Sequence, residues 1–407
     1  MSRGLVLYLH VHQPYRVRPY SVFDTGIDHN YFLTNEYSAD WNNQTVFEKV
    51  ANKSYRPMNA LLKRLLDEHP DFRISLSISG TFLEQAKVWA PDVIDSFKEL
   101  IDTGRVEVLA ETYHHSLAFF YSRDEFERQV NEHRQVIEAT FGVTPRVFRN
   151  TELAYNDELA TWASDKGYAG IIAEGWDPIL GWRSPNYMYR SAGTDLPLLL
   201  KNYRLSDDLA FRFSNQDWAE WPLTADKYHD WIKSSLGNES IINLFMDYET
   251  FGEHQWHDTG IFEFFSSFIR SWSNGNDGTF YTISEAIAAH PPVDEISMPQ
   301  TVTWADTSRD LSAWSGNKLQ QEALRYIYNL ENDVLRTGDT DLLRDWQRLQ
   351  ASDHFYYMCT KGLGDGDVHA YFSPYKSPYD AFLYYLNAVR DLRWRLYAHH
   401  GSGVLGG

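Results

Sequence analysis

The feature that most constrains the fold is a repeated order of short apolar runs, each followed by a segment with helical periodicity. The clearest run, residues 241–246, passes without a glycine or proline into Asp247 and Glu249. Such runs are typical of strands buried on both faces of a parallel sheet, although periodicity alone leaves a buried helix open. Six similar runs precede it, at residues 4–11, 73–79, 105–110, 145–150, 169–173 and 196–202.

Segments with helical periodicity separate these runs. Alternation of strand and helix favours a parallel sheet with helical crossovers, and seven strands of this kind predict an α/β fold. We therefore expect a closed or nearly closed (β/α)7 barrel, a distorted relative of the TIM barrel. The expected helices of this part lie at residues 54–69, 81–102 with an interruption at Pro91, 123–140 and 156–166.

Beyond residue 290 the strand patterns stop, and helical patterns continue at residues 317–336, 339–351 and 377–396. This change predicts a catalytic barrel over residues 1–290 and a C-terminal α-helical domain over residues 291–400 that contributes to the active-site cleft. The tail at 401–407 has the Gly-rich composition of a flexible end.

The charge balance limits the partners. The chain has 37 basic and 56 acidic residues, a net charge of −19, which disfavours binding to nucleic acid or to an anionic membrane. The sequence has no secretory signal pattern, no membrane-length apolar stretch and a single cysteine, Cys359. These features predict a cytoplasmic protein with neither nucleic-acid nor membrane partners, and they leave its oligomeric state open.

Acids and histidines gather where the predicted strands end. His10 and His12 alternate along the first strand and should therefore share a face. Any one acid at such a position could be a helix cap, but the carboxyl ends of barrel strands meet at one rim, which is where barrel enzymes carry their chemistry. The acids expected on this rim are Glu84, Glu111, Glu152, Glu174 and Asp247.

A rim with several carboxylates suits glycoside cleavage, which needs one ionised carboxylate and one protonated carboxylic acid in different environments. Aromatic residues make up 15% of the chain, and their flat faces pack well against the apolar faces of sugar rings. Both observations favour a carbohydrate substrate.

Five motifs, in order along the chain, resemble the signature regions of glycoside hydrolase family 57, most closely its α-amylase-type members. The resemblance implies a (β/α)7 barrel, a C-terminal helical domain and a retaining double-displacement mechanism on α-1,4-glucans such as starch, glycogen and maltooligosaccharides. The motifs are HVHQP at 10–14, SGTFLEQ at 79–85, FRNTELAYND at 148–157, FMDYETFGEH at 245–254 and WADTSRDLSAW at 304–314.

The resemblance also implies roles for single residues. Glu152 matches the nucleophile and Asp247 the general acid/base, and no metal or cofactor is implied. Because Asp247 follows an apolar strand, we expect burial to raise its pKa, with Arg149 or His12 donating hydrogen bonds to Glu152. The residues implied to bind substrate are His10, His12, Glu84, Trp304 and Asp353.

Three alternatives remain at this point. A 4-α-glucanotransferase or branching enzyme would use the same scaffold with a sugar acceptor in place of water. A metal-dependent polysaccharide deacetylase would use His10 and His12 as ligands, but none of the fifteen histidines has another four positions on, the spacing expected of a helical ligand pair. A non-enzymatic glucan-binding protein would keep the aromatic rim without needing Glu152 and Asp247.

Overall fold

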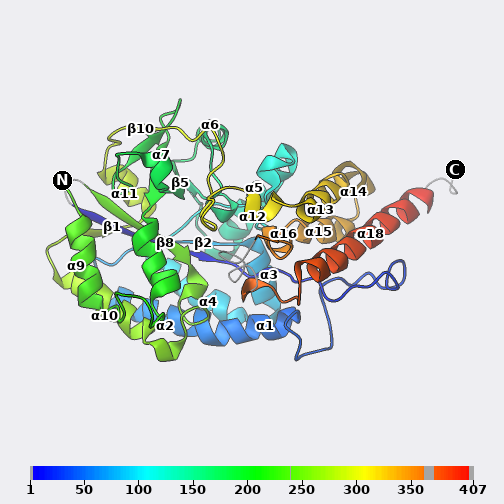
Figure 1. The fold of residues 1–407 in the computed structure, drawn as a ribbon, viewed down its shortest axis with the longest axis horizontal. Coiled ribbons are helices and arrows are strands. Elements are labelled where there is room, and N and C mark those ends of the chain that lie inside the picture. The colour runs from blue at the N-terminus through cyan, green and yellow to red at the C-terminus, as the bar shows by residue number, and fades with distance from the viewer. Residues whose placement is uncertain (1–2, 239, 362–370, 403–407) are drawn as a thin grey trace. The chain divides into compact units, whose positions relative to one another are not determined.

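The computed structural model describes residues 3–238, 240–361 and 371–402 (Figure 1). The chain forms two compact units. The barrel unit comprises Met1–His12, Glu48–Glu111 and Val130–Trp304, and the helical unit comprises Gln13–Phe47, Thr112–Gln129 and Ala305–Gly407. The units are thus discontinuous in sequence, whereas the predicted division was a single boundary at residue 290.

Parallel strands form the centre of the barrel unit. Strand β1 (Gly4–Val11) pairs along its length with β8 (Ile241–Asp247), beside which it lies in Figure 1, and pairs on its other edge with β2. The ladder continues from β2 to β3, and a second ladder joins β4, β5 and β7. These strands are β2 (Ile74–Ile78), β3 (Val106–Val108), β4 (Val147–Phe148), β5 (Gly170–Glu174) and β7 (Pro197–Lys201).

Two local contacts connect the ladders into a ring. Ala110, just beyond β3, forms a parallel bridge with Phe148 of β4. On the other side, the Asn202 amide donates to the Asn243 carbonyl at 2.9 Å, and the Asn243 side chain donates to the Leu200 carbonyl at 2.9 Å. The ring order is therefore β1, β2, β3, β4, β5, β7, β8, which confirms the predicted seven-stranded barrel.

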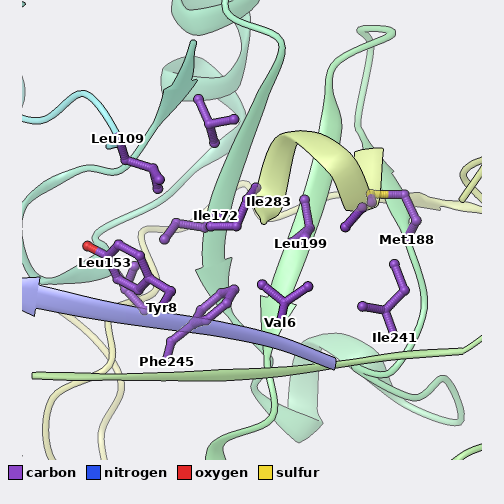
Figure 2. Close-up of a cluster of buried hydrophobic side chains, with 12 residues drawn as sticks. Val6, Tyr8, Leu109, Leu153, Ile172, Met188, Leu199, Ile241, Phe245 and Ile283 are labelled. Carbon is purple, nitrogen blue, oxygen red and sulfur yellow. The ribbon is translucent and has the colours of Figure 1, made fainter. Parts of the chain in front are cut away.

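The interior of the ring is apolar. Side chains of β1, β5, β7 and β8 point toward one another, and Val6, Tyr8, Leu199 and Phe245 are fully buried (Figure 2). Because each CH₂ removed from water contributes about 0.8 kcal/mol, this cluster gives the strands a strong preference for their register.

Helices of the barrel unit lie between the strands, as predicted. Pro91 ends the second predicted helix and begins another, since proline is tolerated only in a helix's first turn. The sequence did not reveal the short strands β6 (Tyr189–Ser191), β9 (Thr279–Tyr281) and β10 (Glu295–Ile296). The helices are α2 (Arg56–Glu68), α3 (Gly80–Trp89), α4 (Pro91–Ile101), α6 (Asp157–Asp165), α7 (Asp177–Leu180), α8 (Tyr203–Asp207), α9 (Ala225–Ser235), α10 (Ile261–Asn274) and α11 (Ile283–Ala289), while α1 (Asn43–Val50) and α5 (Arg123–Phe141) cross the division between units.

The helical unit carries the C-terminal helices. The predicted helix at 317–336 is broken near Asn329 into two, and the last helix extends to Ser402, six residues beyond its predicted end at 396. Residues 364–370, between the predicted helices at 339–351 and 377–396, and residues 403–407 of the predicted tail lie outside the described residues. The helices are α12 (Ser312–Ser315), α13 (Lys318–Tyr328), α14 (Glu331–Thr337), α15 (Thr340–Arg348), α16 (Ser352–Tyr356) and α18 (Pro378–Ser402). Within the described part of the chain, every helix is too short or too polar to cross a membrane.

Candidate active site

His10 and His12 occupy the end of β1 and share a face, as predicted. Their rings stack with centroids 5.8 Å apart and planes 14° apart. His12 Nδ1 lies 2.7 Å from the hydroxyl oxygen of Ser79, which is also the N-cap of α3. The next strand end therefore holds the His12 ring in place.

His10 lies at the centre of a buried charge cluster. Its Nε2 is 3.1 Å from a carboxylate oxygen of Glu111, and its Nδ1 is 3.6 Å from Oδ1 of Asp247. Arg149 lies 3.4 Å from His10 Nδ1 and 3.5 Å from Glu111, and neither the Arg149 nor the Glu111 side chain is exposed. Buried charges are tolerated only when they are paired, so these residues, which lie at the ends of β1 and β8 and just beyond β3 and β4, depend on one another.

Asp247 ends β8, and 39% of its side chain is exposed. Burial acts to raise its pKa, but the contact with His10 and the electrostatic interactions with His10, His254 and Arg149 together lower that pKa below its ordinary value. The expectation of a raised pKa was therefore wrong. The apolar neighbours along β8 are visible in the sequence, whereas His10 and Arg149, which help to decide the outcome, come from other segments.

Glu249, two residues further on, is the acid with the raised pKa. Its side chain accepts hydrogen bonds from the Tyr55 hydroxyl at 2.5 Å and the His12 amide at 3.2 Å. Burial and then the charge of Asp247 raise the pKa of Glu249 to about 8. At neutral pH the segment thus contains one ionised carboxyl, Asp247, and one protonated carboxyl, Glu249, for which no role had been predicted.

The loop that carries Glu249 depends on one glycine. Gly252 has φ +108°, and a Cβ atom there would lie 1.9 Å from the carbonyl oxygen of Lys53. Only glycine fits such a backbone and such a contact. The glycine of the FGEH motif is therefore explained by close approach of the loop to residues just before α2.

Glu152 follows β4 on a tight turn with unusual backbone geometry. Glu152 has φ +60° and Leu153 φ +50°, a left-handed conformation that costs of order 1–3 kcal/mol per non-glycine residue. The indole N–H of Trp304 donates to Glu152 Oε2 at 2.9 Å, and the Trp304 amide donates to the Glu152 carbonyl at 3.2 Å. Trp304 is thus one donor to Glu152 that was not expected, and a hydrogen bond from Arg149 or His12 stays a prediction.

Trp304 also joins Glu152 to the charge cluster. Its ring lies 6.4 Å from the His10 ring and 5.2 Å from the Arg149 guanidinium, centre to centre. Lys201, the last residue of β7, lies 5.5 Å from the same ring and 3.7 Å from Glu174 at the end of β5. In the sequence, this cation is visible as a lysine that ends the apolar run PLLLK, but Lys201 was not predicted as a site residue.

The other two residues predicted to bind substrate, Glu84 and Asp353, lie on helices. Glu84 lies in α3, just past the carboxyl end of β2, and is partly buried. Asp353 lies in α16 of the helical unit and is also partly buried. Their roles in substrate binding stay predictions, whereas His10, His12, Glu152, Asp247 and Trp304 belong to one continuous set of contacts at the carboxyl ends of the barrel strands.

Comparison with known proteins agrees with this geometry. The model of glycosyl hydrolase family 57 matches residues 6–299. A Methanocaldococcus jannaschii protein named "Putative alpha-amylase" is 43% identical over 395 residues, which cover 94% of this chain and 83% of that protein.

Two solved structures share the fold at low identity. The branching enzyme of Pyrococcus horikoshii superposes with a TM-score of 0.66 at 16% identity, covering 91% of this chain and 87% of the other. The 4-alpha-glucanotransferase of Thermococcus litoralis gives 0.63 at 15% identity, covering 87% of this chain and 56% of the other. The resemblance seen in the five motifs is confirmed by the family match: the chain belongs to glycosyl hydrolase family 57.

Proposed function

We propose that the protein cleaves α-1,4-glucosidic bonds in starch, glycogen or maltooligosaccharides with retention, through a covalent glycosyl-enzyme. The observation that carries this proposal is a pair of differently held carboxylates, Glu152 and Asp247, at the carboxyl ends of two strands of one barrel. Family membership and the names of the relatives supply the substrate class. Two carboxylates are the apparatus that a retaining glycosidase requires.

Glu152 acts as the nucleophile. The left-handed turn follows the end of β4, the indole N–H of Trp304 donates to Oε2, and a carboxylate oxygen of Glu152 attacks the anomeric carbon. Attack forms the ester bond to the sugar and breaks the glucosidic bond, whose oxygen takes a proton from Asp247.

Asp247 acts as general acid and then as base. Before substrate binds it is ionised, so the proton must be taken up when a sugar ring covers its exposed side and excludes water, which favours the neutral acid. Once Glu152 is esterified, its negative charge is gone and the pKa of Asp247 falls again. Asp247 can then remove a proton from the water that hydrolyses the ester.

Other residues hold the sugar and the acids. We assign His10, His12 and Glu84 to the subsite of the attacked sugar, with Trp304 and Asp353 in support. The single cysteine of the sequence, Cys359, supports a reducing, cytoplasmic location.

The same chemistry would serve transfer to a sugar acceptor, the activity named for the two structural neighbours. Product analysis with maltoheptaose tests the proposal and separates the two outcomes. Shorter fragments alone mean hydrolysis, and a ladder that includes longer members means transfer. NMR of the first products should show the α-anomer, and an initial β-anomer would contradict the double displacement.

A further inference from the structure

A cavity in the helical unit lies apart from the residues proposed for catalysis. It has a volume of about 350 Å³ and lies between α13 and α14, coloured yellow in Figure 1, and the red helix α18. The buried side chains of Leu330 and Val389 give it an apolar floor. Ligand pockets range over roughly 300–1,000 Å³, so this one suits a ligand of about one sugar unit and not a long glucan chain.

The walls of the cavity are basic. Arg325, Arg390 and Arg393 line it, with Asp333 as the one acid among the lining residues that the structure describes. Three guanidinium groups against one carboxylate are unusual in a chain whose net charge is −19. This balance favours an anionic ligand over a neutral one.

The charges of Arg390 and Arg393 remain available. Arg325 forms an ion pair with Glu322 at 2.5 Å. In contrast, the described residues include no carboxylate within ion-pair distance of Arg390 or Arg393. Arg390 donates to the Asn387 amide oxygen, and Arg393 donates to the Tyr397 hydroxyl. An arginine has five N–H donors, so each still has several to offer to a ligand.

The Arg393 group is also held in position. Its Nε and one terminal nitrogen donate to the Tyr397 hydroxyl at 3.1 and 2.8 Å. Arg390 and Arg393 are three residues apart on α18 and therefore face the same way. Planar guanidinium groups fixed like this bind phosphate with paired hydrogen bonds, and the rings of Tyr326 and Tyr397 supply flat apolar faces for a sugar.

We propose that this pocket binds a phosphorylated monosaccharide, with its phosphate on Arg390 and Arg393 and its sugar ring against the tyrosines. The site is independent of the reaction proposed for the barrel unit. Binding of a phosphate-bearing ligand should weaken as salt is added, because exposed charges are screened.

Isothermal titration of the full chain with glucose 6-phosphate, inorganic phosphate, AMP and maltose tests the proposal. Glucose 6-phosphate should bind most tightly, and the double substitution Arg390→Gln with Arg393→Gln should weaken it by about tenfold or more. Tyr397→Phe, which keeps the ring and frees Arg393, should weaken it by a few fold. Arg344→Gln, an exposed arginine of α15 outside the pocket, is the matched control and should change nothing.

Three results would overturn the assignment. Equal affinity for maltose would mean a neutral glucan site, and tighter binding of AMP or of inorganic phosphate alone would mean a different anion. Binding of glucose 6-phosphate that the double substitution leaves unchanged would place the ligand elsewhere. Circular dichroism of each variant shows whether the helices are intact, and loss of binding in an unfolded variant would leave Tyr397→Phe as the deciding comparison.

Discussion

The ends of β4 and β8 present their carboxylates in different ways. Asp247 is the last residue of a seven-residue strand whose ladder with β1 extends to the Asp247–His10 pair. Glu152 lies beyond a two-residue strand, on a left-handed turn, and is held by Trp304. One carboxylate is thus positioned by regular backbone pairing, whereas the other lies on a strained turn and accepts a hydrogen bond from an indole.

This difference shows what each carboxylate depends on. The backbone of Asp247 needs no special residue, and its state depends on surrounding charge, from His10, Arg149 and His254. Glu152 depends on geometry, because strain persists only where the surrounding structure imposes it. Substitutions near the β8 end should therefore act mainly by changing pKa values. Those near the β4 end should act mainly by changing contacts and backbone conformation.

The largest effect on turnover is expected from removing either carboxylate. Glu152→Gln and Asp247→Asn should each lower the turnover of maltoheptaose by roughly 10³-fold or more, while thermal unfolding stays close to that of the parent. Azide should restore some turnover of an activated aryl glycoside by Glu152→Gln, since Asp247 remains. Glu158→Gln, an exposed acid of α6, is the control. Near-normal activity of a folded Glu152→Gln variant would refute the assignment.

The next largest effect is expected at the contact that is particular to the β4 end. Trp304→Phe removes a donor to Glu152. A hydrogen bond to a charged group is worth about 1.5–3 kcal/mol, so kcat/KM should fall by roughly 10- to 100-fold. Trp162→Phe, in α6 on the outside of the barrel, should leave kcat/KM unchanged. If both variants are equally active, Trp304 does not position the nucleophile.

An effect that is smaller per pH unit should appear in the pH dependence of stability near the β8 end. The pKa of Glu249 is raised from 4.5 to about 8, so between these values the folded protein holds a proton that the unfolded chain has lost. Its contribution to stability is therefore complete below pH 4.5 and falls as pH rises to about 8, by up to about 1.4 kcal/mol per pH unit.

Glu249→Gln imitates the protonated carboxyl and should remove this slope. Denaturant unfolding at pH 5, 6, 7 and 8 measures it for both proteins. Parallel stability curves would mean that Glu249 is not protonated in the folded state.

The smallest effect concerns backbone strain at Glu152. A left-handed backbone costs about 1–2 kcal/mol for a residue with a Cβ, which favours glycine over alanine at this position. Glycine also makes the unfolded chain more flexible, which costs about 0.4–1 kcal/mol on folding. On balance, Glu152→Gly should be more stable than Glu152→Ala by roughly 0.5–1 kcal/mol. The pair Gln135→Gly and Gln135→Ala, at an exposed position in the middle of α5, should show the opposite order. Urea unfolding of the four variants provides the comparison, and the same order at both positions would exclude strain at Glu152.

The amino-acid sequence by itself determined the order of the barrel strands and the carboxylates that follow them. Buried parallel strands must be apolar, and a polar residue at the end of each marks where the strand leaves the core, so the seven strands and their terminal acids could be predicted. The helix break at Pro91 was equally visible, because it depends on the local backbone, whereas the need for glycine at position 252 comes partly from the distant carbonyl of Lys53.

Only the tertiary structure decided which acid is protonated and which residue holds the nucleophile. The pKa values of Asp247 and Glu249 depend on His10, Arg149 and Tyr55, which are far away in the sequence, and the donor to Glu152 comes from Trp304, 152 positions on. Electrostatic interactions and hydrogen bonds act over a few ångströms of space, whatever the separation along the chain. A pattern of neighbours in sequence can therefore predict where an acid lies but not the charges that surround it.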